Sequence, residues 1–102
     1  MVRIYSKGNF NIYASPSQDA YMVHNTRKEF KDGHTHLYNF KTAKFIIDLC
    51  LHKRIPHDLC LYHLESLRRL SDDKEYTRKL EELIHSKKSK KKQMYFNTRK
   101  KK

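Results

Sequence analysis

Apolar and polar side chains alternate over short stretches of residues 1–38, a pattern typical of β-strands with one buried face. Gly8 and Gly33 fall between such stretches, and glycine suits the tight turns that join neighbouring strands. Residues 15–19 break the alternation once more. The pattern predicts a small antiparallel sheet of three or four strands, over residues 2–6, 9–13, 21–25 and 34–38.

From Thr42 onward the apolar residues recur every three or four positions, as they do along one face of a helix. We expect Asn39 or Thr42 to cap a first helix, which ends before Pro56, and Pro56 to begin a second. Ser71, interpreted as a capping serine followed by two acidic residues, predicts the start of a third. The predicted buried residues are Ala43, Ile46, Ile47 and Cys50 in the first helix, Cys60, Leu64 and Leu67 in the second, and Tyr76, Leu80, Leu83 and Ile84 in the third.

These two halves together predict the α+β class, with a small N-terminal antiparallel sheet packed against three C-terminal helices. A chain of 102 residues is about the size of one domain. We therefore expect a single domain over residues 1–85, with strands in residues 1–38 and helices in residues 42–85. Residues 86–102 lack apolar periodicity and are rich in lysine, which predicts a flexible, disordered tail.

Positive charge is concentrated in that tail. The chain has 23 Lys and Arg residues against 11 Asp and Glu, a formal net charge of +12. Residues 86–102 contain nine of the basic residues and none of the acidic ones, so the tail contributes +9 and the rest of the chain +3. Such a run next to a nearly balanced body predicts a polyanionic partner.

Nucleic acid is the polyanion that we expect, because lysines displace counterions from phosphates while Tyr95 and Phe96 can stack on exposed bases. The predicted function is a small basic protein that binds DNA or RNA mostly through the phosphate backbone; a regulatory role is open. The candidate binding residues are Lys87, Lys88, Lys90, Lys91, Lys92, Tyr95, Phe96, Arg99, Lys100, Lys101 and Lys102 in the tail, and Lys53, Arg54, Arg68 and Arg69 in the body.

The alternative is a protein-interaction adaptor or inhibitor of a phage or plasmid type, whose tail binds a host protein or a ribonucleoprotein complex. The usage of Lys, Asn, Tyr and Ile is typical of a low-GC bacterium or its phage. Reading of the major groove by a helix-turn-helix is disfavoured, because Asp58 and Glu65 on the second helix would face phosphates. The chain lacks a signal peptide and a long apolar stretch, so we expect a cytoplasmic protein without a membrane partner; its oligomeric state is open.

Cys50, His52, His57, Cys60 and His63 lie close together in the sequence, and all of them can ligate zinc. Their spacing matches no common zinc-finger pattern, and the apolar stripes require both cysteines. We therefore expect two buried, reduced thiols and neither a metal nor another cofactor.

The motif His34-Thr35-His36-Leu37 resembles the histidine-x-histidine strand of metal-dependent nucleases that cleave single strands with a tyrosine nucleophile. The resemblance implies that both imidazoles hold an ion and that Tyr62 or Tyr76 is the nucleophile. It covers four residues, and Thr35 stands where that family has an apolar residue. Phosphate loops and paired catalytic carboxylates are missing from the sequence, so we expect two surface imidazoles and predict no enzyme.

Overall fold

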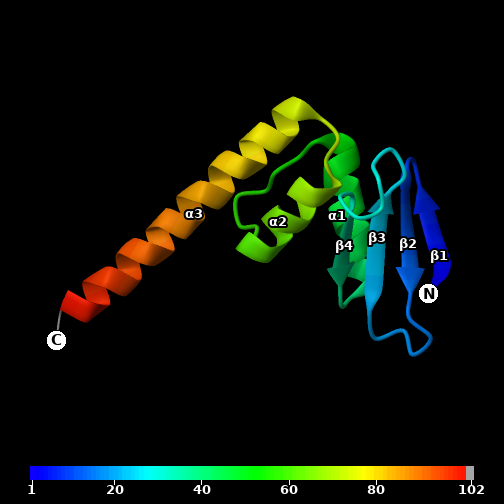
Figure 1. Cartoon of the computed structure of the whole chain (residues 1–102), viewed down its shortest axis with the longest axis horizontal. Coiled ribbons are helices and arrows are strands. Elements are labelled where there is room, and N and C mark those ends of the chain that lie inside the picture. The colour runs from blue at the N-terminus through cyan, green and yellow to red at the C-terminus, as the bar shows by residue number, and fades with distance from the viewer. Residues whose placement is uncertain (101–102) are drawn as a thin grey trace.

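The computed structural model describes residues 1–100, and side chains over residues 1–89. It has the predicted α+β architecture, with one four-stranded sheet followed by three helices (Figure 1). The strands are β1 (Val2–Lys7), β2 (Phe10–Ala14), β3 (Tyr21–Asn25) and β4 (His34–Leu37), and the helices are α1 (Phe40–His52), α2 (Leu61–Leu70) and α3 (Lys74–Lys100).

The sheet is an antiparallel meander in the order β1-β2-β3-β4, so each strand pairs with the next along the chain. Gly8 lies in the tight β1–β2 turn with a φ of 59°, a conformation in which its missing Cβ avoids strain. The β1–β2 register shifts between Arg3 and Tyr5, which marks a bulge in the edge strand. All four predicted strands are confirmed to within two residues.

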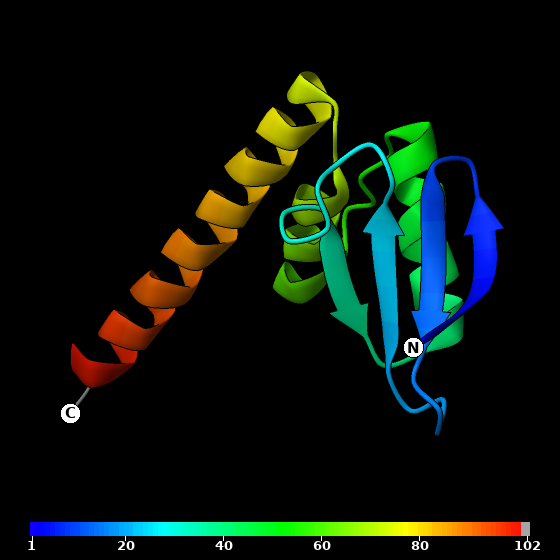
Figure 2. The ribbon, with the colours of Figure 1, turned by 45° about the vertical axis from the view of Figure 1, so that its right-hand side comes forward.

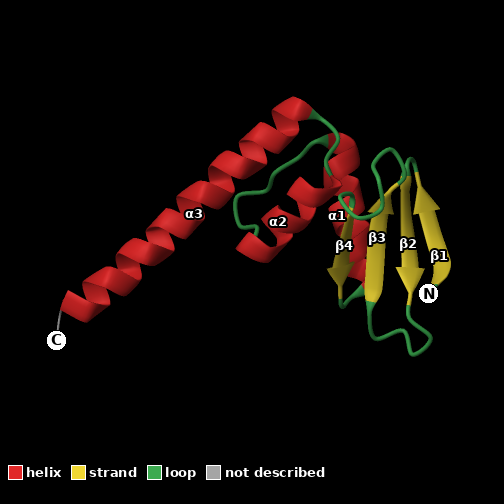
Figure 3. Cartoon of the chain, in the orientation of Figure 1, coloured by secondary structure: helices red, strands yellow, loops and turns green. Residues whose placement is uncertain are grey.

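Helices α1 and α2 lie on one face of the sheet, α3 packs on α2, and the other face of the sheet is open (Figure 2). Ile12, Val23 and Leu37 point from the covered face into a core shared with α1 and α2, and none is more than 1% exposed. Within this core, the Thr35 hydroxyl donates to the Ser66 hydroxyl at 2.9 Å and ties β4 to α2. The domain therefore has two layers, one of strands and one of helices (Figure 3).

Both ends of α1 are capped as its sequence favours. The side chain of Asn39 accepts a hydrogen bond from the Thr42 amide at 3.1 Å, which confirms the predicted N-cap. At the other end Lys53 adopts the left-handed conformation with a φ of 52°, and the Arg54 amide donates to the Leu49 carbonyl at 3.0 Å. This is the usual hydrogen-bond pattern of a helix end, with lysine where glycine is more frequent.

Helix α2 begins at Leu61, so the prediction that it starts at Pro56 is wrong. The chain between α1 and α2 is irregular, and Leu59 is the residue in it that enters the core. Because Leu59 takes that place, Cys60 becomes the exposed N-cap of α2, and its predicted burial is also wrong. The connection is longer than the short turn of a helix-turn-helix.

Helix α3 begins where Asp73 caps it, with the Asp73 carboxylate accepting from the Tyr76 amide at 2.8 Å. The predicted cap at Ser71 is wrong, because Ser71 instead closes the end of α2. Tyr76, Leu80 and Ile84 are buried, as predicted. Leu83 is 40% exposed, against the prediction, because a spacing of four residues forms a narrow stripe and Leu83 falls beside it.

The same helix continues past His85, where we expected it to end, to Lys100 (Figure 1). Lysine and glutamine are good helix formers, and no glycine or proline interrupts this segment. The flexibility of residues 86–102 stays a prediction. No helix within residues 1–100 has both the length and the apolar character needed to cross a membrane.

Candidate nucleic-acid interface

Arg69, a predicted binding residue of the body, has a structural role. Its guanidinium donates to the carbonyl of His34 at 2.9 Å and to that of Lys31 at 3.3 Å. In the same region the Lys28 ammonium donates to the Arg69 and Ser71 carbonyls, at 2.8 and 3.1 Å. The two cations therefore fasten the β3–β4 loop to the C-terminal end of α2, where unpaired carbonyls favour positive charge.

Arg69 and Tyr62 also protect the free edge of β4. Carbonyls along a strand point alternately to its two sides, and the Gly33 carbonyl pairs with the Asn25 amide on the β3 side. The carbonyls of His34 and His36 therefore point away from β3, where they accept from Arg69 and from the Tyr62 hydroxyl. Partial burial and the nearby Tyr38 raise the pKa of Tyr62, so its hydroxyl keeps the proton that it donates. This edge is closed to a further strand.

The other body cations lie on different elements of the fold. Arg68 lies in a hollow of about 310 Å³ between α2 and α3, together with Glu65, Glu81 and Lys88. Lys88 forms an ion pair with Glu65 at 3.1 Å, so charges of both signs meet there. Lys53 and Arg54 are exposed at the end of α1.

Two of the tail candidates have described side chains. Lys88 is exposed in the hollow just described, and Lys87 is partly buried on the same helix. The others lie outside the described side chains: Lys90, Lys91, Lys92, Tyr95, Phe96, Arg99, Lys100, Lys101 and Lys102. For these residues the structure gives at most the path of α3.

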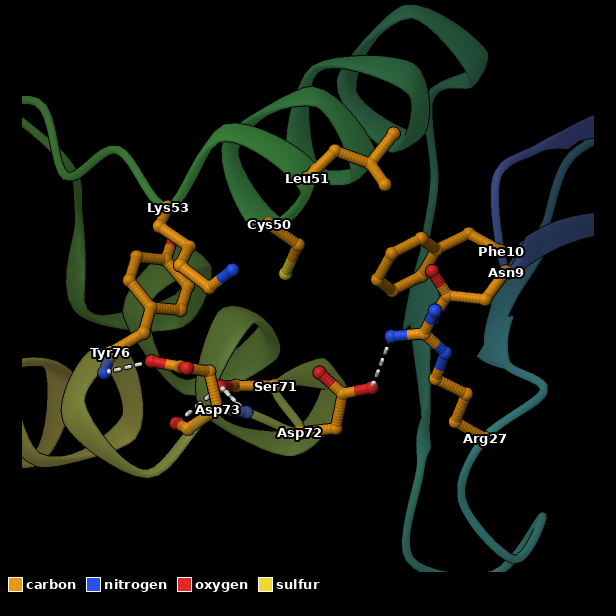
Figure 4. Close-up of a pocket in the computed structure, with 10 residues that line it drawn as sticks. All are labelled: Asn9, Phe10, Arg27, Cys50, Leu51, Lys53, Ser71, Asp72, Asp73 and Tyr76. Atoms are coloured by element: carbon orange, nitrogen blue, oxygen red, sulfur yellow. Dashed lines mark hydrogen bonds and ion pairs between the residues drawn. The ribbon is translucent and has the colours of Figure 1, made fainter.

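A cavity of about 160 Å³ lies between the β1–β2 turn, the end of α1 and the start of α3 (Figure 4). Cys50 faces it, and burial raises the pKa of the Cys50 thiol to about 12, so this cysteine stays protonated and unreactive. Asp73 at its wall caps α3, and Asp72 lies 3.7 Å from Arg27. The polar groups here serve the fold, and they form no nucleophile with a base beside it.

The predicted zinc candidates are spread apart by the fold. Cys50 is buried against α2, whereas Cys60 is exposed at the start of that helix. Among the residues whose side chains are described, no three histidine, cysteine or acidic side chains gather as metal ligands. Of the two tyrosines implied by the nuclease resemblance, Tyr76 donates its hydroxyl to the Arg54 carbonyl at 2.8 Å, which leaves it inside the fold.

The open face of the sheet carries two rows of side chains that cross all four strands. The strand register aligns them directly. The first row is Arg3, Tyr13, Met22 and His36, and the second is Ser6, Asn11, His24 and His34. We call these eight residues the open-face rows. They are polar or aromatic apart from Met22, and neighbouring side chains leave Met22 7% and Asn11 9% exposed.

Rings cluster at the β3–β4 end of the open-face rows. Phe30, from the loop between these strands, stacks on His34 with ring centroids 4.6 Å apart and planes 9° from parallel. The rings of His24 and His36 lie 5.4 Å from Phe30 and 5.1 Å from His34 respectively. Four aromatic rings thus form one continuous group on the surface.

His34 and His36 are expected from the sequence as two surface imidazoles, and their grouping with Phe30 and His24 is not predicted. The alternation places His24, His34 and His36 opposite Val23, Thr35 and Leu37, which is a signal that these rings share the solvent face. Phe30 could not be found in this way, because it belongs to a loop without periodicity. Comparison of this chain with protein-family models, with curated proteins and with solved structures finds no match.

Proposed function

We propose that this protein binds nucleic acid, and that the basic C-terminal part of α3 makes most of the contacts with phosphates. The main support for this proposal is the uneven distribution of charge, because +9 of the net charge of +12 lies in residues 86–102. Residues 86–100 of this segment belong to a long helix, α3, that extends away from the sheet layer (Figure 1).

The two parts of α3 differ in how their charges are balanced. In the first part Arg78 bridges Glu75 and Glu82, both at 2.5 Å, along one face of the helix. This bridging raises the pKa of Arg78 and lowers that of Glu75. From Ser86 onward the sequence contains no acidic residue, so pairs of this kind cannot form within that part of the helix. The positive charge of the second part is thus not neutralised within the helix itself, although Lys88 pairs with Glu65 of α2.

Lysines in such a segment bind a polyanion by replacing its condensed counterions, which makes the affinity fall steeply with salt. Phosphate contacts of this kind position a protein without reading sequence. The proposed binding is therefore strongly salt-dependent and weakly sequence-dependent.

The test is a salt series on random-sequence duplex DNA with the full chain and with a Lys90→Gln, Lys91→Gln, Lys92→Gln variant. Each lost phosphate contact lowers the slope of log affinity against log salt by about 0.9 on duplex DNA. We expect the slope to fall by about 2 to 3 units, as measured by fluorescence anisotropy of a labelled duplex.

A matched control removes the same charge elsewhere, with Lys41→Gln, Lys74→Gln and Lys79→Gln at exposed positions. This control should keep most of the slope of the unchanged protein. Equal slopes for both triple variants contradict a dedicated role of the segment. Absence of affinity for DNA and RNA at low salt refutes the proposal, and a stoichiometric protein partner recovered after nuclease treatment then favours the adaptor alternative.

A further inference from the structure

We propose that the open face of the sheet binds the bases of a single-stranded nucleic acid by stacking. This inference rests on the proposed function, and it adds a second site and the strandedness of the ligand. In this arrangement the basic part of α3 holds phosphates, whereas the open-face rows hold bases.

The dimensions of the open face suit a short run of nucleotides. Neighbouring strands lie about 4.8 Å apart, so each open-face row spans roughly 14 Å from β1 to β4. Four-stranded sheets with aromatic residues on an open face stack two or three bases in this way. No helix within residues 1–100 covers this face (Figure 2).

The ring group supplies the surface on which a base can stack. Phe30 is 51% exposed and lies outside the hydrophobic core, so its position contributes little to burial. Its parallel stacking on His34 nevertheless holds the ring in a fixed orientation. His36 is exposed at the end of one row, and Tyr13 lies partly exposed on the other side of Met22 in the same row. A preformed, partly exposed set of rings reduces the entropy that stacking must overcome.

The charge of the face complements a phosphodiester chain. None of the four strands contains an acidic residue, and Arg3 stands at the β1 end of the first row. The remaining strand cation, Lys7, donates to Asp48 of α1 on the covered side at 2.7 Å. Acids occur at the rim, where Glu29 and Asp32 share the β3–β4 loop with Arg27, Lys28 and Lys31. A strand lying along the open-face rows therefore meets rings, one hydroxyl, one amide and one guanidinium.

A duplex fits this face poorly, because its bases stack on each other and their faces cannot reach the rings. A protein ligand is also less suited. Binding grooves for peptides and helices are lined by apolar side chains, whereas Asn11 and three histidines occupy the open-face rows. Single-stranded nucleic acid can stack its bases on the exposed rings, and its phosphates meet no carboxylate on the four strands.

The first experiment uses tryptophan fluorescence, since the chain contains no tryptophan. A Tyr13→Trp variant places the probe in the first open-face row. A matched Phe45→Trp variant places it on α1, on the helical side, where Phe45 is 43% exposed. On addition of an eight-nucleotide oligo(dT), we expect the fluorescence of Tyr13→Trp to be quenched and that of Phe45→Trp to stay constant. Equal responses at saturating oligonucleotide overturn the inference.

The second experiment measures how a Phe30→Ala, His36→Ala variant binds single-stranded and duplex DNA, compared with the unchanged protein. Both side chains are exposed, so we expect the variant to melt as the unchanged protein does. Loss of stacking on one base should weaken the binding of oligo(dT) about 5-fold to 100-fold. Affinity for duplex DNA should change less than about two-fold.

Failure of this inference and failure of the proposed function give different results. In one outcome the Phe30→Ala, His36→Ala variant binds oligo(dT) as tightly as the unchanged protein while the Lys90→Gln, Lys91→Gln, Lys92→Gln variant binds it more weakly. That result overturns the stacking site and keeps the proposed phosphate binding. Equal losses of affinity for single strands and duplexes in the Phe30→Ala, His36→Ala variant also overturn the stacking site, because stacking on the rings requires unpaired bases. A full chain that binds neither form refutes both. Binding of an apolar peptide that oligo(dT) does not displace assigns the face to a protein instead.

Discussion

The two faces of the sheet are built from the same four strands and have opposite chemistry. On the covered face Ile12, Val23 and Leu37 are closed off by α1 and α2. On the open face, neighbouring residues in the same strands are Tyr13, His24 and His36. This difference between the buried apolar residues and the residues of the open face indicates that the covered face accounts for the stability of the fold. The open face has no such requirement, so its aromatic side chains call for another explanation.

Adjacent residues of β4 provide the sharpest test of this difference. Leu37→Ala removes a side chain that is 1% exposed and leaves a cavity, so we expect a loss of about 2–5 kcal/mol in the free energy of unfolding. His36→Ala, one residue away, should change it by less than about 0.5 kcal/mol, since the Tyr62 bond is made to the His36 carbonyl. Urea denaturation of both variants is the measurement. Similar losses would show that the open face also holds the fold together.

The covered face could be predicted from sequence because burial leaves a periodic record. Alternation predicted all four strands, and Asn39 caps α1 as predicted; at α3 the cap is Asp73, two residues after the predicted Ser71. The start of α2 was missed, because Pro56 is compatible with a first helical turn but burial of Leu59 fixes an irregular connection instead. Cys60 was misplaced because it precedes α2 as its N-cap, and Leu83 because a stripe read from spacing alone is wider than the contact that one helix makes.

The candidate sites left weaker records. Nothing in the composition indicates that Arg69 and Lys28 donate to backbone carbonyls, because those carbonyls are brought to them by segments far along the chain. The open-face rows depend on the register between strands, which places His24 opposite His34 only after the sheet forms. Phe30 joins this group through a loop contact that periodicity does not encode.

Two asparagines on opposite faces give a second, smaller contrast. Asn25 is fully buried, donates to the Leu70 carbonyl at 2.8 Å and accepts from the Asn9 side chain and the Arg27 amide. Asn25→Ala leaves these buried partners without a bond, so we expect a loss of about 1–3 kcal/mol in the free energy of unfolding.

Asn11 on the open face is the matched control. Its side chain makes one long contact of 3.5 Å with the Tyr13 hydroxyl. Asn11→Ala should therefore cost less than about 1 kcal/mol. A larger loss for Asn11→Ala than for Asn25→Ala, measured by thermal and urea unfolding, would contradict the division between the faces.

The smallest expected effect lies at the margin of the covered face, where Lys7 of β1 reaches Asp48 of α1. The hydrogen bond from Lys7 lowers the pKa of Asp48 in the folded protein, so protonation of Asp48 favours the unfolded chain. The stabilisation is therefore present above the unfolded pKa of an aspartate, about 3.9, and is lost as pH falls through the lowered folded value. Both side chains are nearly half exposed, so solvent and salt weaken the pair.

At pH 7 and low salt Asp48→Asn should melt at a slightly lower temperature than the unchanged protein, and this gap should close below about pH 4 or in 1 M salt. The two proteins differ only at residue 48, so the pH dependence of the gap reports on the Asp48 carboxylate. A difference in melting temperature that widens on acidification would mean that Asp48 stabilises the folded state in its protonated form. The pair with Lys7 would then not be the contact that joins β1 to α1.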